Sequence, residues 1–203
     1  ADTGSVGSAA GKINTAANFS GSNYLSVADN ARLSMGDIDF TLSGWVYMGD
    51  KTDNRTVVSK YDSNGVNQRE YLIQYNLVND RFQFFVSSDG SSGASIFADA
   101  LGSPSINTWY YVVAWHDSVS NTINIQVNNG TVNSSAHSTG VFDGTASFSI
   151  GAANNGASAL MNGRIDAVGV WKRVLSAGER TSLYNSGNGV ETFAPSSPTS
   201  LVA

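Results

Sequence analysis

Short runs of β-prone residues, separated by turns rich in Gly, Asn and Ser, recur along almost the whole chain. About ten runs are recognisable, and their short spacing is typical of a β-sandwich rather than of alternating strands and helices. Residues 40–48 (FTLSGWVYM) and 122–128 (TINIQVN) alternate in the way expected of strands with one buried face. The runs lie at residues 18–27 (two short strands), 40–48, 56–61, 70–77, 81–87, 109–116, 122–128, 148–151 and 164–171.

Two pairs of these runs are predicted to form hairpins. Residues 70–77 and 81–87 flank a turn centred on Asn79 and Asp80. Residues 109–116 and 122–128 are separated by only five residues. Connections this short join antiparallel neighbours, so the sequence predicts antiparallel sheets.

One helix is predicted near the end of the chain. Ser176 and Glu179 have the spacing of a capping box, in which each side chain can accept the other residue's backbone amide. Leu183 and Tyr184 are expected on the inner face of this helix, and Gly187 is expected to end it. The sequence therefore predicts an all-β protein, an antiparallel two-sheet sandwich with one short helix on its C-terminal side.

The composition excludes several classes of protein and partner. The net charge is −5 and the eleven Lys and Arg are scattered singly, so neither nucleic acid nor a membrane surface is an expected partner. No apolar run approaches the ~20 residues needed to span a bilayer. The absence of Cys excludes disulfides, thiolate metal sites and Cys nucleophiles. Low charge with much Ser, Thr and Asn favours a secreted, extracellular protein of bacterial or phage origin.

Three segments together resemble the consecutive motifs of laminin-G-like domains in the concanavalin A-like lectin/glucanase superfamily. They are FTLSGWVYM, TWYYVVAWHDSVSNTINIQVNNG and GRIDAVGVWKRVLSAGERTSLYNSG, and the resemblance covers roughly residues 17–189. It implies a jelly roll of two antiparallel sheets whose loops at one rim bind ligands. Members of this superfamily serve as carbohydrate-binding modules, adhesion domains and non-catalytic appendages of glycan-degrading enzymes.

The resemblance also sets the expected domain limits. Residues 1–190 are predicted to form the sandwich, and residues 191–203 a linker-like tail with two of the three prolines. The first strand usual in such domains is not found, so either it is missing or another segment takes its place. The tail resembles the opening of a fibronectin type III repeat, which indicates neighbouring domains of a larger extracellular protein.

The sequence lacks the groups that glycan hydrolysis needs. Retaining glycosidases place two carboxylates about 5 Å apart, and none of the three Glu is paired with another acid along a strand. Asp37 and Asp39 have the i, i+2 spacing of such a pair, but they precede a strand and fit a turn better. His116 and His137 have no nucleophile motif nearby. The protein is therefore predicted not to be an enzyme.

Candidate ligand-binding residues come from the aromatic and polar positions near strand ends. Trp45, Trp109 and Trp171 occupy framework positions of the resemblance and are expected in the core. Trp115 and His116 end a strand, where a loop rim begins, and are predicted to contact ligand. On another strand the predicted ligand contacts are Arg69, Tyr71 and Gln74.

A structural calcium ion is implied by the resemblance alone. In this superfamily such an ion often joins an early Gly-rich loop to an Asp of the terminal strand, and the matching positions are Gly21, Ser22, Asn23 and Asp166. Oxygen donors of this kind suit calcium. An Arg or backbone amides are the alternative partners for Asp166, whose burial unpaired would be costly.

These observations predict a non-catalytic binding module whose partner is a carbohydrate, either a polysaccharide or a glycoconjugate. Two alternatives stay open: a protein-interaction or adhesion module of a bacterial surface or phage structural protein, and an auxiliary domain derived from an enzyme. Exposed coplanar aromatic rings in a groove would favour sugar, and a broad apolar patch would favour protein.

Overall fold

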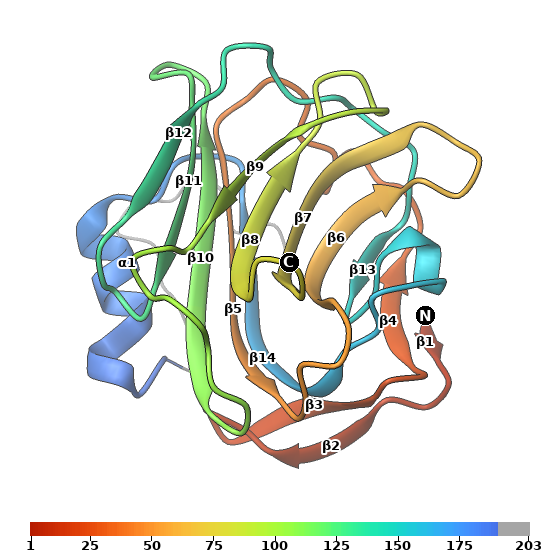
Figure 1. The fold of residues 1–203 in the computed structure, drawn as a ribbon, viewed down its shortest axis with the longest axis vertical. Coiled ribbons are helices and arrows are strands. Elements are labelled where there is room, and N and C mark those ends of the chain that lie inside the picture. Colours follow the sequence, from red (N-terminus) through yellow and green to blue (C-terminus); the bar gives the residue numbers. More distant parts are fainter. Residues whose placement is uncertain (191–203) are drawn as a thin grey trace.

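The computed structural model of the protein describes residues 1–190, which form two antiparallel sheets of seven strands each (Figure 1). From edge to edge, sheet A contains β1 (Asp2–Thr3), β4 (Tyr24–Val27), β13 (Phe148–Ile150), β6 (Arg55–Asp62), β7 (Gln68–Asn76), β8 (Arg81–Val86) and β9 (Ala94–Phe97). Sheet B contains β12 (Asn133–Ala136), β11 (Thr122–Val127), β10 (Trp109–Asp117), β5 (Phe40–Met48), β14 (Asn162–Trp171), β3 (Thr15–Ser20) and β2 (Gly7–Ala10). The predicted all-β jelly-roll sandwich is confirmed.

The main core lies between the sheets because alternate residues of each strand point inward. In β5, Phe40, Leu42 and Val46 belong to this core and are fully buried. Phe40 meets Tyr71 of β7 and Phe84 of β8, with ring centroids 5.6 Å and 6.1 Å away. Both predicted hairpins are confirmed, since β7 pairs with β8 and β10 pairs with β11.

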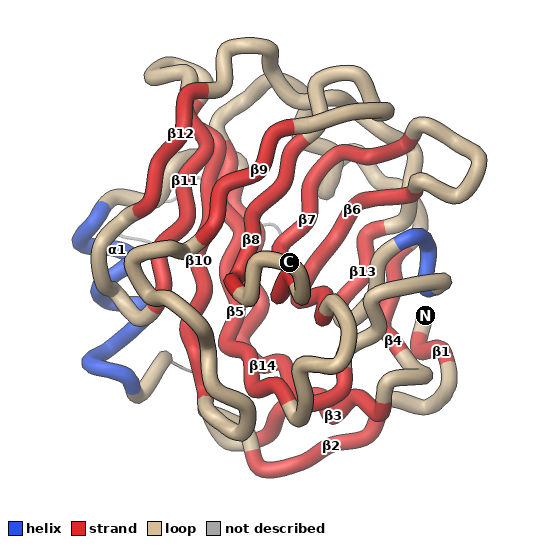
Figure 2. Tube along the Cα trace, in the orientation of Figure 1, coloured by secondary structure: helices blue, strands red, loops and turns tan. Residues whose placement is uncertain are grey.

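A second apolar cluster covers the outer face of sheet B. It includes Trp45, Trp115 and Trp171, and the helix α1 (Ala177–Tyr184) lies over it. Tyr184 stacks on Trp45 with ring centroids 5.8 Å apart and planes inclined by 16°. Figure 2 shows this helix outside β10 and β11. Trp45 and Trp171 are core residues as predicted, whereas Trp109 is only partly buried.

The capping box of α1 is present in full. Ser176 accepts the amide of Glu179, and the Glu179 carboxylate accepts the amide of Ser176 at 2.9 Å. The helix ends earlier than predicted, because Asn185 takes the left-handed conformation with φ 48° and closes it. Asn tolerates this conformation nearly as well as Gly, so the prediction that Gly187 ends the helix was wrong by about half a turn.

Four strands have no counterpart in the sequence prediction: β1, β2, β9 and β12. They are edge strands of two to four residues, too short to show an alternating pattern in the sequence. β2 pairs with β3, so residues 7–10 supply an edge strand where the usual motif is not found. The predicted linker-like tail, residues 191–203, lies outside the described residues. Within residues 1–190, no helix is long and apolar enough to cross a membrane.

Candidate functional site

The predicted ligand residues of β10 are buried. Trp115 is 7% exposed because α1 covers it, with the guanidinium carbon of Arg180 4.2 Å from the ring centroid. His116 is 1% exposed and points into the core, where its Nδ1–H donates to the carbonyl of Ile38 at 2.9 Å. The prediction that these two residues contact ligand was wrong, because this end of β10 is covered on both faces.

The predicted residues of β7 are separated by the pleat of the strand. Tyr71 points into the core with 0% exposure, and its hydroxyl donates to the carbonyl of Leu33 at 2.7 Å. Gln74 lies on the opposite face, where its amide donates to a Gln of β8 at 2.8 Å. Arg69 is partly exposed, 5.8 Å from the ring centroid of Tyr61. Since β7 and β10 belong to different sheets, the five predicted residues form no common surface.

The structure does not bring together the predicted calcium ligands, which are Asp166, Gly21, Ser22 and Asn23. Antiparallel pairing of β14 with β3 places Asp166 at one end of the shared ladder and residues 21–23 beyond the other. Asp166 Oδ2 accepts the amide of Ile13 at 2.8 Å, which confirms the alternative of a backbone partner. Asn23 Oδ1 accepts a backbone amide of β3 at 2.9 Å. These residues do not fit the calcium site implied by the resemblance.

The buried residues Tyr71 and His116 instead hold a loop. Residues 28–39 connect β4 to β5 and are called the rim loop. The carbonyls that accept from Tyr71 and His116 both belong to it. Lys172, which follows β14, donates to the carbonyls of Ala31 and Ser34 of this loop, at 2.7 Å each. The rim loop is therefore fixed from the core and from β14, although it contains no helix or strand.

The rim loop forms one wall of a cavity of about 460 Å³, called the rim cavity. Residues 143–145, between β12 and β13, form the other wall. This volume lies within the range of roughly 300–1,000 Å³ typical of small-molecule sites. The lining combines two carboxylates, two hydroxyls, one ammonium group and apolar surface, from Asp29, Asp143, Ser34, Thr145, Lys172, Met35 and Ile38.

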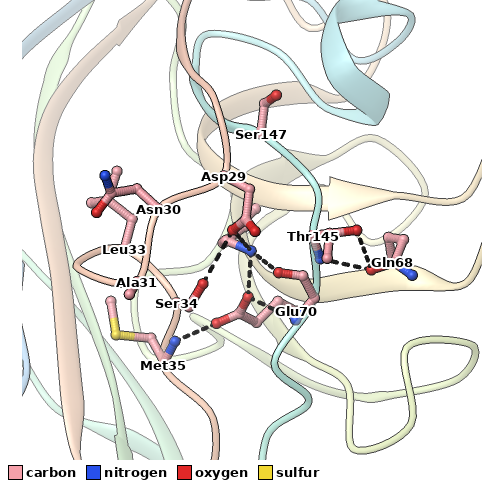
Figure 3. A network of polar contacts seen from close by, with 12 residues as sticks. Asp29, Asn30, Ala31, Leu33, Ser34, Met35, Gln68, Glu70, Thr145 and Ser147 are labelled. Carbon is pink, nitrogen blue, oxygen red and sulfur yellow. Dashed lines mark hydrogen bonds and ion pairs between the residues drawn. The ribbon is translucent and has the colours of Figure 1, made fainter.

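A buried ion pair fixes both walls of the rim cavity from below (Figure 3). Lys60 of β6 and Glu70 of β7 are fully buried, and Lys60 Nζ lies 3.0 Å from Glu70 Oε2. Lys60 Nζ also lies 3.0 Å from Asp29 Oδ1 and donates to the carbonyl of Gly144. Glu70 accepts the backbone amides of Met35 and Gly144, the latter at 3.2 Å. Each wall is thus bound to the same two side chains.

The pKa values of the two acids in this network, Asp29 and Glu70, are shifted in opposite directions. Hydrogen bonding to the Lys60 ammonium lowers the pKa of Asp29, which keeps this carboxylate ionised at the cavity mouth. Burial raises the pKa of Glu70, although Lys60 and two amides oppose the shift. A retaining glycosidase needs a carboxyl of raised pKa and an ionised carboxylate that both touch the sugar. Because Glu70 is fully buried, the arrangement favours binding over catalysis.

Sequence reasoning missed the rim cavity. Asp29 and Asp143 lie in loops that carry no motif. The usable signal was Lys60, a cation inside the otherwise β-prone run at residues 56–61. A buried Lys requires a partner, and Glu70 at the start of the next run was the available one.

Residues 19–179 match the Laminin_G_3 family, described as the concanavalin A-like lectin/glucanases superfamily, and the chain therefore belongs to this family. The match confirms the resemblance seen in the sequence. No curated protein sequence matches the chain.

Three solved structures illustrate the shared fold. Domain 4 of AbnA, a GH43 extracellular arabinanase from Geobacillus stearothermophilus solved with arabinotriose, is 16% identical with a TM-score of 0.67, covering 92% of this chain and 82% of that one. A structure of botulinum neurotoxin type C, whose cell entry depends on two ganglioside molecules, is 15% identical with a TM-score of 0.66, covering 92% and 46%. The binding domain of botulinum neurotoxin DC in complex with rat synaptotagmin II is 15% identical with a TM-score of 0.66, covering 92% of this chain and 46% of that one. The chain spans about half the length of the two toxin structures.

Proposed function

We propose that the protein is a non-catalytic carbohydrate-binding module and that the rim cavity seats the sugar. The observation that carries this proposal is the fixed mouth of the cavity, where Asp29 and Asp143 present carboxylates beside the hydroxyls of Ser34 and Thr145. Carboxylates accept strong hydrogen bonds from hydroxyl groups such as those of sugars. Walls held by buried side chains lose little conformational entropy when a ligand binds, which favours affinity.

The similar structures support glycans as the first ligand class to test. One was solved with arabinotriose, and another concerns a toxin that depends on gangliosides. The first belongs to an extracellular enzyme, and we propose an extracellular location for this protein as well. Linkage to the further domains of a larger extracellular protein is part of the same proposal.

Protein docking is less well supported. A synaptotagmin complex among the similar structures makes a protein partner the second candidate. The most exposed large apolar side chains, Val78 and Val119, lie in two different hairpin turns. Isolated apolar residues of this kind are normal on protein surfaces and do not mark an interface.

Replacing Asp143 with Ala is expected to weaken glycan binding about tenfold or more, because one charge-assisted hydrogen bond is lost. Asp143 is exposed and has no hydrogen bond or ion pair within residues 1–190. The free energy of unfolding should therefore change by less than about 0.5 kcal/mol. A glycan array identifies the ligand, and isothermal titration calorimetry then compares the dissociation constants.

The matched control is Asp53→Ala, which removes an equally exposed carboxylate from the β5–β6 loop, away from the rim cavity. It should bind like the parent protein. The proposal would be contradicted if the protein bound no glycan on the array, or if the Asp143 variant bound glycan as tightly as the parent.

We also expect the protein to release no sugar from any polysaccharide that it binds. Glu70 is buried, and Asp39 of the Asp37–Asp39 pair accepts the amide and hydroxyl of Ser118 at 2.8 Å and 2.7 Å. Within residues 1–190, neither Glu70 nor Asp39 is therefore free to act on a substrate. Reducing ends are measured after prolonged incubation, and turnover that disappears in Asp143→Ala would show that the cavity is catalytic.

A further inference from the structure

A row of side chains crosses the outer face of sheet B far from the rim cavity. In register, Trp109 of β10 faces Tyr47 of β5, and Tyr47 faces Arg164 of β14. These three residues are called the aromatic–arginine strip. Tyr47 is seven residues from Phe40, which follows the rim loop. Seven strand residues span about 23 Å, so the strip and the rim cavity are separate places on the molecule.

The Tyr47 ring contacts the other two side chains of the strip, and all three remain partly exposed. The rings of Tyr47 and Trp109 lie 5.4 Å apart with planes inclined by 53°. The guanidinium carbon of Arg164 lies 4.7 Å from the centroid of Tyr47. Gly163 allows β14 to lie close to β5, because a Cβ there would come 2.0 Å from the carbonyl oxygen of Tyr47. In contrast to the other Trp of this sheet face, Trp109 offers aromatic surface to solvent.

The strip contains a cation that forms no ion pair with a carboxylate of residues 1–190. Arg164 forms no ion pair there, and its guanidinium Nη1 donates to the carbonyl of Ala10 at 3.1 Å. Lys12 also lacks an ion pair and lies 4.9 Å from the centroid of Trp45 on the same face. Asp166, two residues after Arg164, accepts a backbone amide instead. Five other cations are paired with carboxylates: Lys51, Arg55, Lys60, Arg81 and Arg173.

We propose that the aromatic–arginine strip is a second binding site, specific for a carboxylate-bearing glycan. A sugar ring packs its C–H face on Trp109, and its carboxylate accepts two hydrogen bonds from the planar guanidinium of Arg164. Arg suits this role because its donors match a carboxylate in a fork and its plane stacks on an aromatic ring. Arg164 and Lys12, which lie on the same sheet face without an ion pair, provide the charge complementarity that selects an acidic ligand.

The test uses matched acidic and neutral ligands. Trigalacturonate, trimannuronate and 3′-sialyllactose are titrated into the protein by calorimetry, each beside its own carboxyl methyl ester. Esterification removes the charge and leaves the sugar rings unchanged. At least one acid should bind about tenfold more tightly than its ester. Raising the salt concentration should weaken the binding of the acid but not that of the ester.

Variants then locate the site. Arg164→Gln should reduce affinity for the acid about tenfold and leave the weak binding of the ester unchanged. Arg164→Lys should restore only part of the affinity, because Lys keeps the charge but loses the planar fork. The matched control is Arg32→Gln, which removes an exposed cation without an ion pair from the rim loop and should bind like the parent.

Each other outcome overturns the second site. Equal binding of acid and ester shows that charge plays no part. Loss of acid binding in Asp143→Ala, with Arg164→Gln unaffected, places the acid in the rim cavity. A change in sedimentation coefficient on Arg164→Gln identifies the strip as a contact between copies of the chain, and absence of binding by all three acids removes the site. Failure of the rim cavity to bind glycan leaves this test unaffected.

Discussion

Replacing Lys60 with Met is expected to lower the free energy of unfolding by about 3–5 kcal/mol at neutral pH, the usual cost of removing one partner of a buried ion pair. Lys60 and Glu70 are both fully buried. Without the ammonium group, Glu70 retains only the amides of Met35 and Gly144. Denaturant unfolding followed by Trp fluorescence gives the value.

The pH dependence of this effect follows from the pKa of Glu70, which burial raises in the folded protein. The ionised carboxylate is penalised only in the folded state, so the penalty is complete above the folded-state pKa. It falls as the pH decreases through that pKa and the folded protein takes up the proton. The difference between Lys60→Met and the parent should therefore be larger near about pH 8 than near about pH 5.

A second variant separates the lost charge from lost packing. Lys60→Met with Glu70→Gln keeps an amide oxygen to accept from the wall residues and leaves no buried charge. It should recover more than half of the lost stability. In Lys60→Met alone, hydrogen exchange should accelerate at Met35 and Gly144 before the rest of the protein. A cost below about 1 kcal/mol, or no recovery in the double variant, would show that this pair does not organise the rim.

The fold was predictable because its signals are local. The alternation of residues 40–48 and 122–128, the two short hairpin connections and the capping box at Ser176 and Glu179 all reproduce in the structure. β9 and β12 were missed because each is only four residues long, too short to show an alternating pattern of its own. Gly187 was misplaced because the sequence contained an Asn able to end the helix two residues earlier.

The candidate site was not predictable because its parts meet only in three dimensions. Asp29 and Gly144 are 115 positions apart, and they share Lys60 through contacts that no sequence spacing specifies. The predicted ligand residues failed for a related reason. Trp115 was expected at an open rim, but the chain after β14 folds back as α1 and covers it. Tyr71 and His116 do contact the rim loop, but they hold it from inside.

Trp171→Ala is expected to lower the free energy of unfolding by about 3–5 kcal/mol, the usual range for a buried Trp. Trp171 is 5% exposed and belongs to the cluster between sheet B and α1, together with Leu175 and Leu183. Its ring lies over Gly169, where an added Cβ would come 2.0 Å from the indole. Truncation leaves a cavity that this close packing cannot refill without moving the helix.

Trp109→Ala provides the matched comparison, because Trp109 is a Trp of the same sheet face that is only partly buried and has Tyr47 as its ring partner. Its cost should be about 1–2 kcal/mol, since less surface is removed from contact. Only one of the two variants should lose affinity for the ligand. At a temperature where both are folded, Trp171→Ala should bind the acidic trisaccharide like the parent, while Trp109→Ala should lose about tenfold in affinity. An equal loss of stability in both variants, with binding unchanged, would show that Trp109 is a core residue and does not contact the ligand.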